Sequence, residues 1–216
     1  MNPNDFVCMY INLDSRPDRN KQAILEFKKI KDIFPVVHRI SAECFDIPNF
    51  TPQTRGILGC MSSHIKCLQI AQHEQKHLLV FEDDVEFVGN YGEIIPSAID
   101  ELPEDWNMLY LGGNIMKPCH QVTSHLAKLN HCQSTHAHIV NHNFIEKLAT
   151  YLPMNQVVPI DVVYAEKVIP ENSCYIVAPE MVAIQRDSRS DIDGVDATYD
   201  LPSKRYKENF VKMEAE

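Results

Sequence analysis

An apolar run that ends in acidic residues constrains the fold of this chain more than any other feature. Leu78–Phe81 contains no polar residue, and Glu82, Asp83 and Asp84 follow it directly. A short apolar run without alternation predicts a central parallel strand that is buried on both faces. Side chains at the carboxyl end of such a strand face the crevice in which open α/β sheets bind ligands. We therefore expect these carboxylates to lie in a ligand site.

Adjacent carboxylates repel one another unless protons or a cation compensate their charge. A hard divalent ion with oxygen ligands is the simplest compensation. In an extended chain Glu82 and Asp84 face one side and Asp83 faces the other, so Glu82 and Asp84 are the candidate metal ligands. The alternative is a solvated acidic turn, because short acidic clusters are common. The buried strand in front of the acids favours the metal site.

Charge and composition exclude several classes of protein. The chain has 216 residues, 44% of them hydrophobic, and a net charge of −10, which is typical of a soluble globular protein with no electrostatic footprint for nucleic acid. No apolar run reaches the roughly 18 residues of a membrane span, and the first residues do not resemble a secretory leader. The seven cysteines are scattered, as suits reduced thiols. We expect a cytoplasmic protein without a membrane span.

The remaining sequence alternates between strand and helix patterns. Strands are predicted at Phe6–Ile11, Val36–Ile40, Trp106–Leu111, Ser134–Val140 and Cys174–Ala178. Helices are predicted between the first two strands and at Thr54–Leu68, Tyr91–Leu102, Phe144–Tyr151, Val162–Ile169 and about 199–216. Met116–His136 and Ala183–Ile192 are predicted to be irregular. This alternation predicts one α/β domain over residues 1–216, whose charged last helix could also lead to a further domain.

The loop after the first strand carries Arg16 and Arg19 beside a helix start, which Ser15 or Asp18 could cap. Free N–H groups and the helix dipole favour phosphate at such a place. Two arginines could clamp a diphosphate there. The alternative is that they are surface charges paired with Asp14 and Asp18.

Two glycines, Gly56 and Gly59, lie early in the helix predicted from Thr54. Each costs about 1 kcal/mol relative to alanine, which indicates that another group approaches the helix backbone closely. Ser63 and His64 could face the same ligand, although a single histidine in a helix is more often a surface or core residue.

Two further sets of residues leave alternatives open. Cys119, Cys132, His136 and His138 allow a zinc interpretation, but neither cysteine has the short paired spacing of structural zinc sites. Asp161 either caps the helix that follows it or serves as a base or sugar ligand at the edge of the sheet.

Several segments, taken in order and spacing, resemble glycosyltransferase family 25, the lipopolysaccharide and collagen galactosyltransferase-like group. The matching segments are Ile11–Arg19, Gly56–His64, Leu79–Val85, Thr135–Asn141, Pro159–Asp161 and Gln185–Ile192. The resemblance implies a GT-A fold, which is a Rossmann-like mixed central sheet flanked by helices. It also implies a nucleotide-sugar donor, usually a UDP-sugar, and a divalent metal, usually Mn²⁺ (or Mg²⁺), at an acid-any-acid motif.

The resemblance also assigns roles to single residues. Glu82 and Asp84 resemble the metal motif, with Asp84 the more secure ligand, since Glu82 could act through water. The residues that resemble or adjoin the donor site are Asn12, Leu13, Arg16, Arg19, Gly59, Ser63, His64 and Asp83. If the anomeric centre inverts, as the family suggests, the acceptor hydroxyl needs a base, for which Asp161 is the first candidate and Asp191 the second.

These observations predict a metal-dependent glycosyltransferase that moves a hexose to a hydroxyl group of a glycan, lipopolysaccharide or protein acceptor. One alternative is a noncatalytic nucleotide-sugar-binding module of the same fold. Another is a nucleotidyltransferase, which normally has a glycine-rich loop near the first strand. Asn12–Arg19 contains no glycine.

Overall fold

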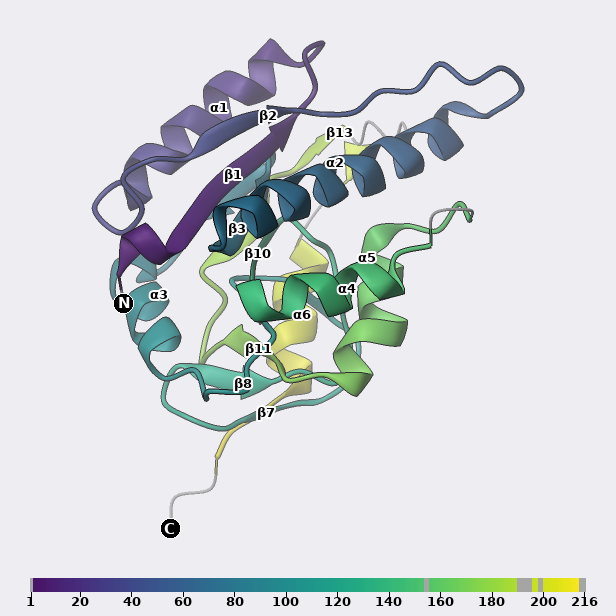
Figure 1. Ribbon diagram of the computed structural model, residues 1–216. Coiled ribbons are helices and arrows are strands. Elements are labelled where there is room, and N and C mark those ends of the chain that lie inside the picture. Colours follow the sequence, from purple (N-terminus) through teal and green to yellow (C-terminus); the bar gives the residue numbers. More distant parts are fainter. Residues whose placement is uncertain (1, 154–155, 190–195, 198–199, 214–216) are drawn as a thin grey trace.

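The centre of the computed structural model is one large mixed sheet; the structure describes residues 2–153, 156–189, 196–197 and 200–213. Its strands are β1 (Phe6–Asn12), β2 (His38–Ser41), β3 (His77–Glu82), β5 (Met108–Tyr110), β7 (Cys119–Gln121), β8 (Leu126–Lys128), β10 (Ala137–Val140), β11 (Cys174–Val177) and β15 (Phe210–Val211). They form a nine-stranded sheet in the order β15-β7-β8-β11-β5-β10-β3-β1-β2, which Figure 1 shows in the middle of the molecule. The predicted α/β class with a mixed sheet is confirmed.

The acidic run ends a strand inside this sheet. β3 pairs with β1 in parallel and with β10 in antiparallel orientation, so the prediction of a parallel environment holds on one side only. Leu78 to Phe81 are at most 1% exposed, as the apolar run predicts. Ile11 lies opposite Glu82 in the register of β1 and β3, which brings the loop after β1 beside the acidic residues.

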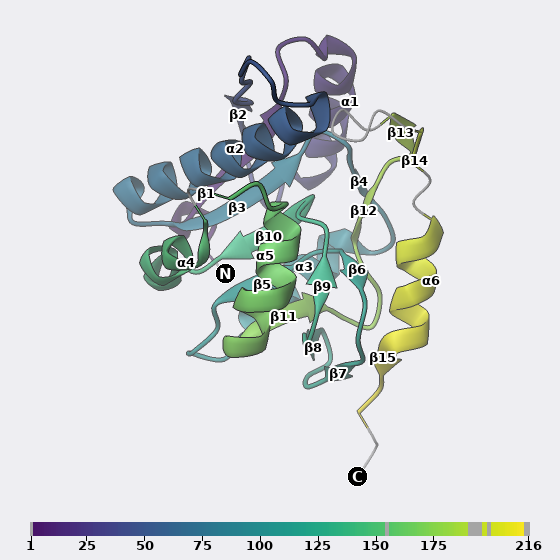
Figure 2. The ribbon, with the colours of Figure 1, turned by 90° about the vertical axis from the view of Figure 1, so that its right-hand side faces the viewer.

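Helices cover both faces of the sheet. They are α1 (Pro17–Phe27), α2 (Pro52–Glu74), α3 (Tyr91–Asp100), α4 (Ile145–Tyr151), α5 (Ile160–Val163) and α6 (Asp200–Asn209). Leu78 and Val80 belong to the core cluster that contains residues of α2, α4 and α5, whereas Leu79 and Phe81 belong to the cluster that contains residues of α1 and α3. The alternation of side chains along β3 therefore builds both halves of the core. Figure 2 shows α2, α4 and α5 together on one side of the sheet.

Two segments predicted to be irregular contain short strands. Met116–His136 holds β7, β8 and the two-residue β9 (Cys132–Gln133). Ala183–Ile192 holds β12 (Ala183–Gln185), which pairs with β4 (Val85–Phe87), and the start of a small hairpin. Strands of two or three residues show no periodicity in sequence, because pairing with distant strands and not local pattern decides them.

Two helix ends also differ from the prediction. The N-cap of α1 is Arg16 and has no side-chain capping bond, so neither Ser15 nor Asp18 takes that role. The C-terminal helix does not reach residue 216: α6 ends at Asn209, whose side chain donates to the carbonyl oxygen of Ile115, and β15 then pairs with β7.

The part of the chain that the structure describes contains no helix with the length and apolarity needed to cross a membrane.

Candidate functional site

A cavity of about 540 Å³ opens at the carboxyl ends of β1 and β3. Its wall consists of the ends of these strands, the segment 42–46 that follows β2, the first turns of α2, and Gln185 of β12. Its volume lies in the range of small-molecule sites. The predicted site residues that line it are Asn12, Leu13, Arg19, Gly59, Ser63, His64, Glu82, Asp83 and Asp84.

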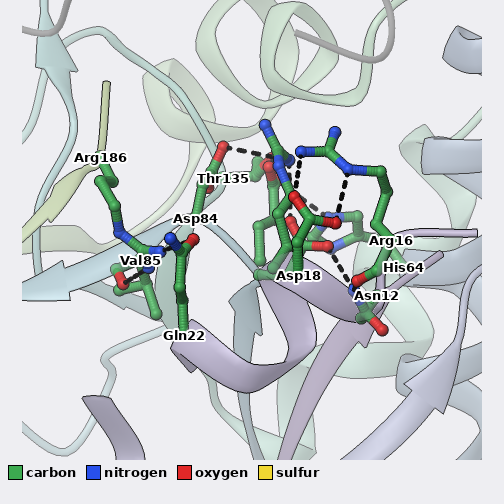
Figure 3. A network of polar contacts seen from close by, with 12 residues as sticks. Asn12, Arg16, Asp18, Gln22, His64, Asp84, Val85, Thr135 and Arg186 are labelled. Carbon is green, nitrogen blue, oxygen red and sulfur yellow. Dashed lines mark hydrogen bonds and ion pairs between the residues drawn. The ribbon is translucent and has the colours of Figure 1, made fainter. Parts of the chain in front are cut away.

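Two predicted site residues do not line this wall, and a third is not described. Arg16 and Asp161 are not among the residues that line the cavity, and Asp191 lies outside the residues that the structure describes. Arg16 makes a two-pronged contact with Asp18, with Nη2 2.9 Å from Oδ2 and Nε 3.1 Å from Oδ1 (Figure 3). The predicted pairing with Asp18 is therefore present, and of Arg16 and Arg19 it is Arg19 that lines the cavity.

The acidic residues form a turn and not an extended strand. Glu82 is the last residue of β3, and Asp83 and Asp84 lie in the turn before β4. The prediction that Glu82 and Asp84 face one side of an extended chain is therefore wrong, because the chain is not extended at Asp83 and Asp84. All three carboxylates nevertheless line the same cavity, because the turn keeps them at the edge of the sheet.

Asp83 is held by partners on the first strand and helix. Asn12 Nδ2 donates to Asp83 Oδ2 at 2.6 Å, and Arg19 Nη1 donates to Oδ1 at 2.8 Å. Arg39 Nε in turn donates to Asn12 Oδ1 at 2.9 Å. Both partners of the Arg19–Asp83 ion pair are about nine-tenths buried. Asp83 thus ties the loop after β1 to the acidic turn.

Asp84 is a buried carboxylate with incomplete compensation. Its Oδ1 atom has no hydrogen-bond partner among the described residues, and its Oδ2 atom lies 3.7 Å from Arg19 Nη1. Burial, followed by the neighbouring charge of Glu82, raises the pKa of Asp84 to about 7. The backbone N–H of Arg186 donates to the Asp84 carbonyl oxygen at 2.7 Å and so fixes the turn. Within the described residues, the ionic compensation of this carboxylate is therefore the long contact with Arg19.

Glu82 has polar partners, and no lysine or arginine of the described chain forms an ion pair with it. Thr135 Oγ1 donates to Glu82 Oε1 at 2.7 Å, and His64 Nε2 lies 3.4 Å from the same oxygen. Burial alone raises the pKa of Glu82, but these contacts with His64 and Thr135 outweigh it and lower the pKa to about 2. Glu82 is therefore ionised at neutral pH, next to the poorly compensated Asp84.

Within the described ranges, the lysines and arginines around the cavity pair more closely with other acids than with these two. Five acidic residues and two arginines line the wall. Glu43 pairs with Lys66, Asp46 with Arg55 and Asp83 with Arg19. Glu82 and Asp84 are the remaining acidic members of this wall. Among the described residues, Asp84 has the longer contact with Arg19 at 3.7 Å, and Glu82 has the contact with His64 at 3.4 Å.

A sulfur atom lies beside Glu82, which the sequence did not indicate. Cys60 Sγ, a ring nitrogen of His64 and a carboxylate oxygen of Glu82 lie within 4.8 Å of one another. In the described ranges this is the only group of three or more such residues close enough to hold one ion. The alternative zinc set of Cys119, Cys132, His136 and His138 is not assembled there.

Gly59 and Ser63 position the cavity wall. A Cβ atom on Gly59 would collide with the carbonyl oxygen of Glu43, which confirms the predicted close approach to the helix backbone. Ser63 Oγ donates to the Gly59 carbonyl oxygen at 2.6 Å and accepts from the Glu43 N–H at 2.8 Å. The segment 42–46 is thereby attached to α2.

Replacement of Ser63 by alanine should loosen this attachment. The Glu43 N–H loses its acceptor, so we expect the free energy of unfolding to fall by about 1–3 kcal/mol. Urea unfolding of Ser63→Ala and of Ser62→Ala, one residue earlier on the same helix, measures the effect. Equal losses in the two variants would show that the Ser63 bonds do not attach the segment.

Asp161 lies near the acidic residues without facing the cavity. Its Oδ1 atom accepts from the Val162 N–H at 2.8 Å and its Oδ2 atom from the Ser134 N–H at 3.3 Å. Pro159 is the N-cap of α5, so Asp161 is in the first turn and is not the predicted cap. Burial, and to a lesser degree the charge of Glu82, raises the pKa of Asp161.

Sequence reasoning missed several residues that build the site. Arg39 and Thr135 bond to Asn12 and Glu82. A charged residue and a hydroxyl residue, each within a predicted strand, were the available signals. The backbone of Arg186 gave no signal, because its role follows only from the pairing of β12 with β4.

Comparisons with known proteins agree with this geometry. The model of glycosyltransferase family 25 (LPS biosynthesis protein) matches residues 7–159. A procollagen lysyl hydroxylase and glycosyltransferase of Acanthamoeba polyphaga mimivirus is 26% identical over 91% of this chain and 27% of its own length. A probable inactive glycosyltransferase 25 family member 3 of Bos taurus is 25% identical over 50% of this chain and 20% of its own length. The chain thus spans about a quarter or less of these relatives.

A solved structure shares the fold at low sequence identity. It is a glycosyltransferase involved in the glycosylation of the major capsid of PBCV-1, with a TM-score of 0.51 and 11% identity over 79% of this chain and 80% of that one. Because the family model covers more than half of the sequence, the chain belongs to glycosyltransferase family 25.

Proposed function

We propose that this chain is a metal-dependent glycosyltransferase that moves a hexose from a nucleotide-diphosphate sugar, a UDP-sugar, to an acceptor hydroxyl. The observation that carries the proposal is the pair Glu82 and Asp84, which line the cavity at the sheet edge and have no lysine or arginine within 3.5 Å among the described residues. Residues 1–216 act as one domain in this proposal, because one sheet joins strands from both ends of the described chain.

The donor set of this pair fits a hard divalent ion. Asp84 Oδ1 is buried and lacks a partner among the described residues, and carboxylate oxygens are the ligands that Mn²⁺ and Mg²⁺ prefer. A diphosphate would add negative charge to a wall where acids outnumber arginines, so binding requires added positive charge. When bound, the ion would stabilise the charge that develops on the leaving diphosphate.

The chain's own residues would hold and orient the donor. Asn12 and Leu13 at the end of β1, together with the segment 42–46 and the first turns of α2, surround the volume available to it. Arg19 is fixed by Asp83, and its positive charge would face the phosphates. Arg16 is assigned no contact with the donor, since it is not part of this wall.

Asp161 is the proposed base for an inverting transfer, and Asp191 is the second candidate. The raised pKa of Asp161 supports this role, because a base works best when its pKa lies closer to the working pH. The viral relative is named for procollagen lysyl hydroxylase activity as well as glycosyl transfer, which favours a protein-linked hydroxyl over a glycan or lipopolysaccharide acceptor.

The proposal also includes the cellular compartment and a further domain as a partner. The seven cysteines are all free thiols, which supports a reducing, cytoplasmic compartment. The greater length of the curated relatives supports a further domain as a partner.

Release of the nucleoside diphosphate tests the function. The full chain is mixed with Mn²⁺ or Mg²⁺ and a panel of UDP-sugars, with and without acceptor peptides and glycans. We expect release that requires the ion and that falls strongly in Asp84→Ala. Failure to bind or turn over any nucleotide sugar, or an Asp84→Ala variant equal to the wild type, would contradict the proposal.

A noncatalytic nucleotide-sugar-binding module is the second candidate. It is favoured by the place of Asp161 outside the cavity wall, and the bovine relative is named as probably inactive. Calorimetry separates the two functions. Ion-dependent donor binding without diphosphate release, unchanged in Asp161→Asn, would favour the binding module, whereas release that Asp161→Asn abolishes with donor affinity retained would favour the enzyme.

A further inference from the structure

Cys60, His64 and Glu82 form a compact group within the cavity wall. Cys60 and His64 are four residues apart on α2, so their side chains lie on one face of the helix. Glu82 reaches them from the end of β3. The sulfur, nitrogen and oxygen atoms lie within 4.8 Å of one another, and all three residues line the cavity.

This set of atoms differs in chemistry from the Glu82 and Asp84 pair. A thiolate, an imidazole and a carboxylate are ligands that Zn²⁺ accepts in tetrahedral geometry, whereas Mn²⁺ and Mg²⁺ prefer oxygen. Tetrahedral bonds of about 2.0–2.3 Å place ligand atoms roughly 3.3–3.8 Å apart. Small side-chain rotations would bring the three atoms to that spacing. The fourth position would face the open cavity.

We propose that Cys60, His64 and Glu82 bind Zn²⁺, and that this ion inhibits the enzyme because it takes Glu82 away from the hard ion. The two sites share Glu82, so they cannot both be complete. Binding replaces the Cys60 S–H bond with a sulfur–zinc bond and releases the thiol proton to solvent. The inhibition rests on the proposed function, but the binding does not.

The surroundings of His64 indicate a reversible site. His64 Nδ1 is buried and has no hydrogen-bond partner among the residues that the structure describes. The ring of His64 stacks on the ring of His138, with 5.7 Å between the two ring centroids. Zinc-binding histidines are usually held by a second hydrogen bond, and loss of such a partner weakens metal binding by about 10–100-fold. We therefore expect chelators to remove the ion without unfolding the protein.

Cobalt binding to the full chain tests the site directly. Co²⁺ is used as the probe, because a thiolate ligand gives it an intense charge-transfer absorption. We expect this absorption in the wild type, its loss on addition of Zn²⁺, and its loss in Cys60→Ser. Cys44→Ser is the matched control, since Cys44 is an exposed thiol of the same cavity wall outside the group, and it should keep the absorption.

Circular dichroism establishes that the Cys60→Ser variant is folded, and His64→Gln provides a second variant that retains the thiol. No thiolate absorption in the wild type, or an absorption that persists in folded Cys60→Ser, would overturn the zinc site. Loss in Cys44→Ser instead would assign the ion to a different thiol and would equally overturn it.

Inhibition is measured separately, against the Mn²⁺-supported rate of each variant. We expect the Zn²⁺ concentration for half-inhibition to be about tenfold higher or more in Cys60→Ser than in the wild type or in Cys44→Ser. Loss of a ligand should weaken zinc binding at least as much as loss of a residue that hydrogen-bonds to a ligand. Equal sensitivity of the variants would refute the inhibitory role. Cobalt binding without any turnover would instead refute the proposed function and leave the zinc site standing.

Discussion

Asp84→Asn is expected to abolish metal-dependent transfer and, in the same protein, to stabilise the metal-free fold at neutral pH. The variant loses a charged ligand of the proposed ion, which should lower turnover on the order of 10²–10³-fold. The pKa of Asp84 is raised to about 7 in the fold, compared with about 3.9 in an unfolded chain. The stability that this group contributes is therefore present below the unfolded pKa and is lost as pH rises towards the folded pKa.

Asparagine removes this loss because it cannot ionise. A shift of about three units corresponds to an upper limit of roughly 4 kcal/mol, and we expect a gain of about 1–3 kcal/mol at pH 8 and little change at pH 4. Urea unfolding of the wild type and the variant at the two pH values, without metal, measures this gain in the free energy of unfolding. Glu86→Gln, which removes an acid two residues along the chain and outside the cavity wall, serves as the control.

The wild type should show the same linkage when it binds the proposed ion. An ion at Asp84 must displace a proton when the pH is below about 7, so Mn²⁺ should raise the melting temperature of the wild type more at pH 8 than at pH 5.5. In Asp84→Asn this rise should largely disappear at both pH values. An Asp84→Asn variant that is less stable than the wild type at pH 8 would mean that the native turn compensates this carboxylate without an ion.

The sequence predicted the acidic edge of the sheet because its cause is local. An apolar run followed by acids could be interpreted with one rule, that a strand buried on both faces ends at a crevice. β3 agrees with this rule, because Leu78–Phe81 are buried. The two early glycines of α2 likewise indicated a close approach, which the Glu43 carbonyl makes at Gly59. Such features depend on the local sequence and on contact with one neighbouring segment.

What the sequence could not predict depends on contacts between distant segments. Arg16 and Arg19 are equivalent in the loop sequence, yet only Arg19 faces Asp83, because α1 begins at Pro17 and turns the two side chains differently. Cys60 is one of seven cysteines, and nothing near it in sequence places it beside Glu82. The pairing of β12 with β4, which brings Arg186 to the acidic turn, is likewise a property of the assembled fold.

Arg19→Met is expected to cause the largest loss of stability among the residues of this site. The guanidinium compensates Asp83 at 2.8 Å and approaches Asp84 at 3.7 Å, in a place where the three side chains are at most 10% exposed. Its removal leaves buried carboxylates unpaired next to the ionised Glu82, for which we expect a cost of about 3–5 kcal/mol. Arg16→Met is the matched control, because the more exposed pair with Asp18 should contribute about 0–1 kcal/mol.

A double-mutant cycle separates the unpaired charge from lost packing. Arg19→Met combined with Asp83→Asn should recover about 1–3 kcal/mol of the loss, because the double variant no longer buries the stranded Asp83 charge. Chemical unfolding of the two single variants and the double variant at pH 7.5 gives the coupling energy directly. Additive losses, or an Arg19→Met variant no less stable than Arg16→Met, would mean that the ion pair does not hold the loop after β1 to the acidic turn. The cavity at the ends of β1 and β3 would then need another source of order.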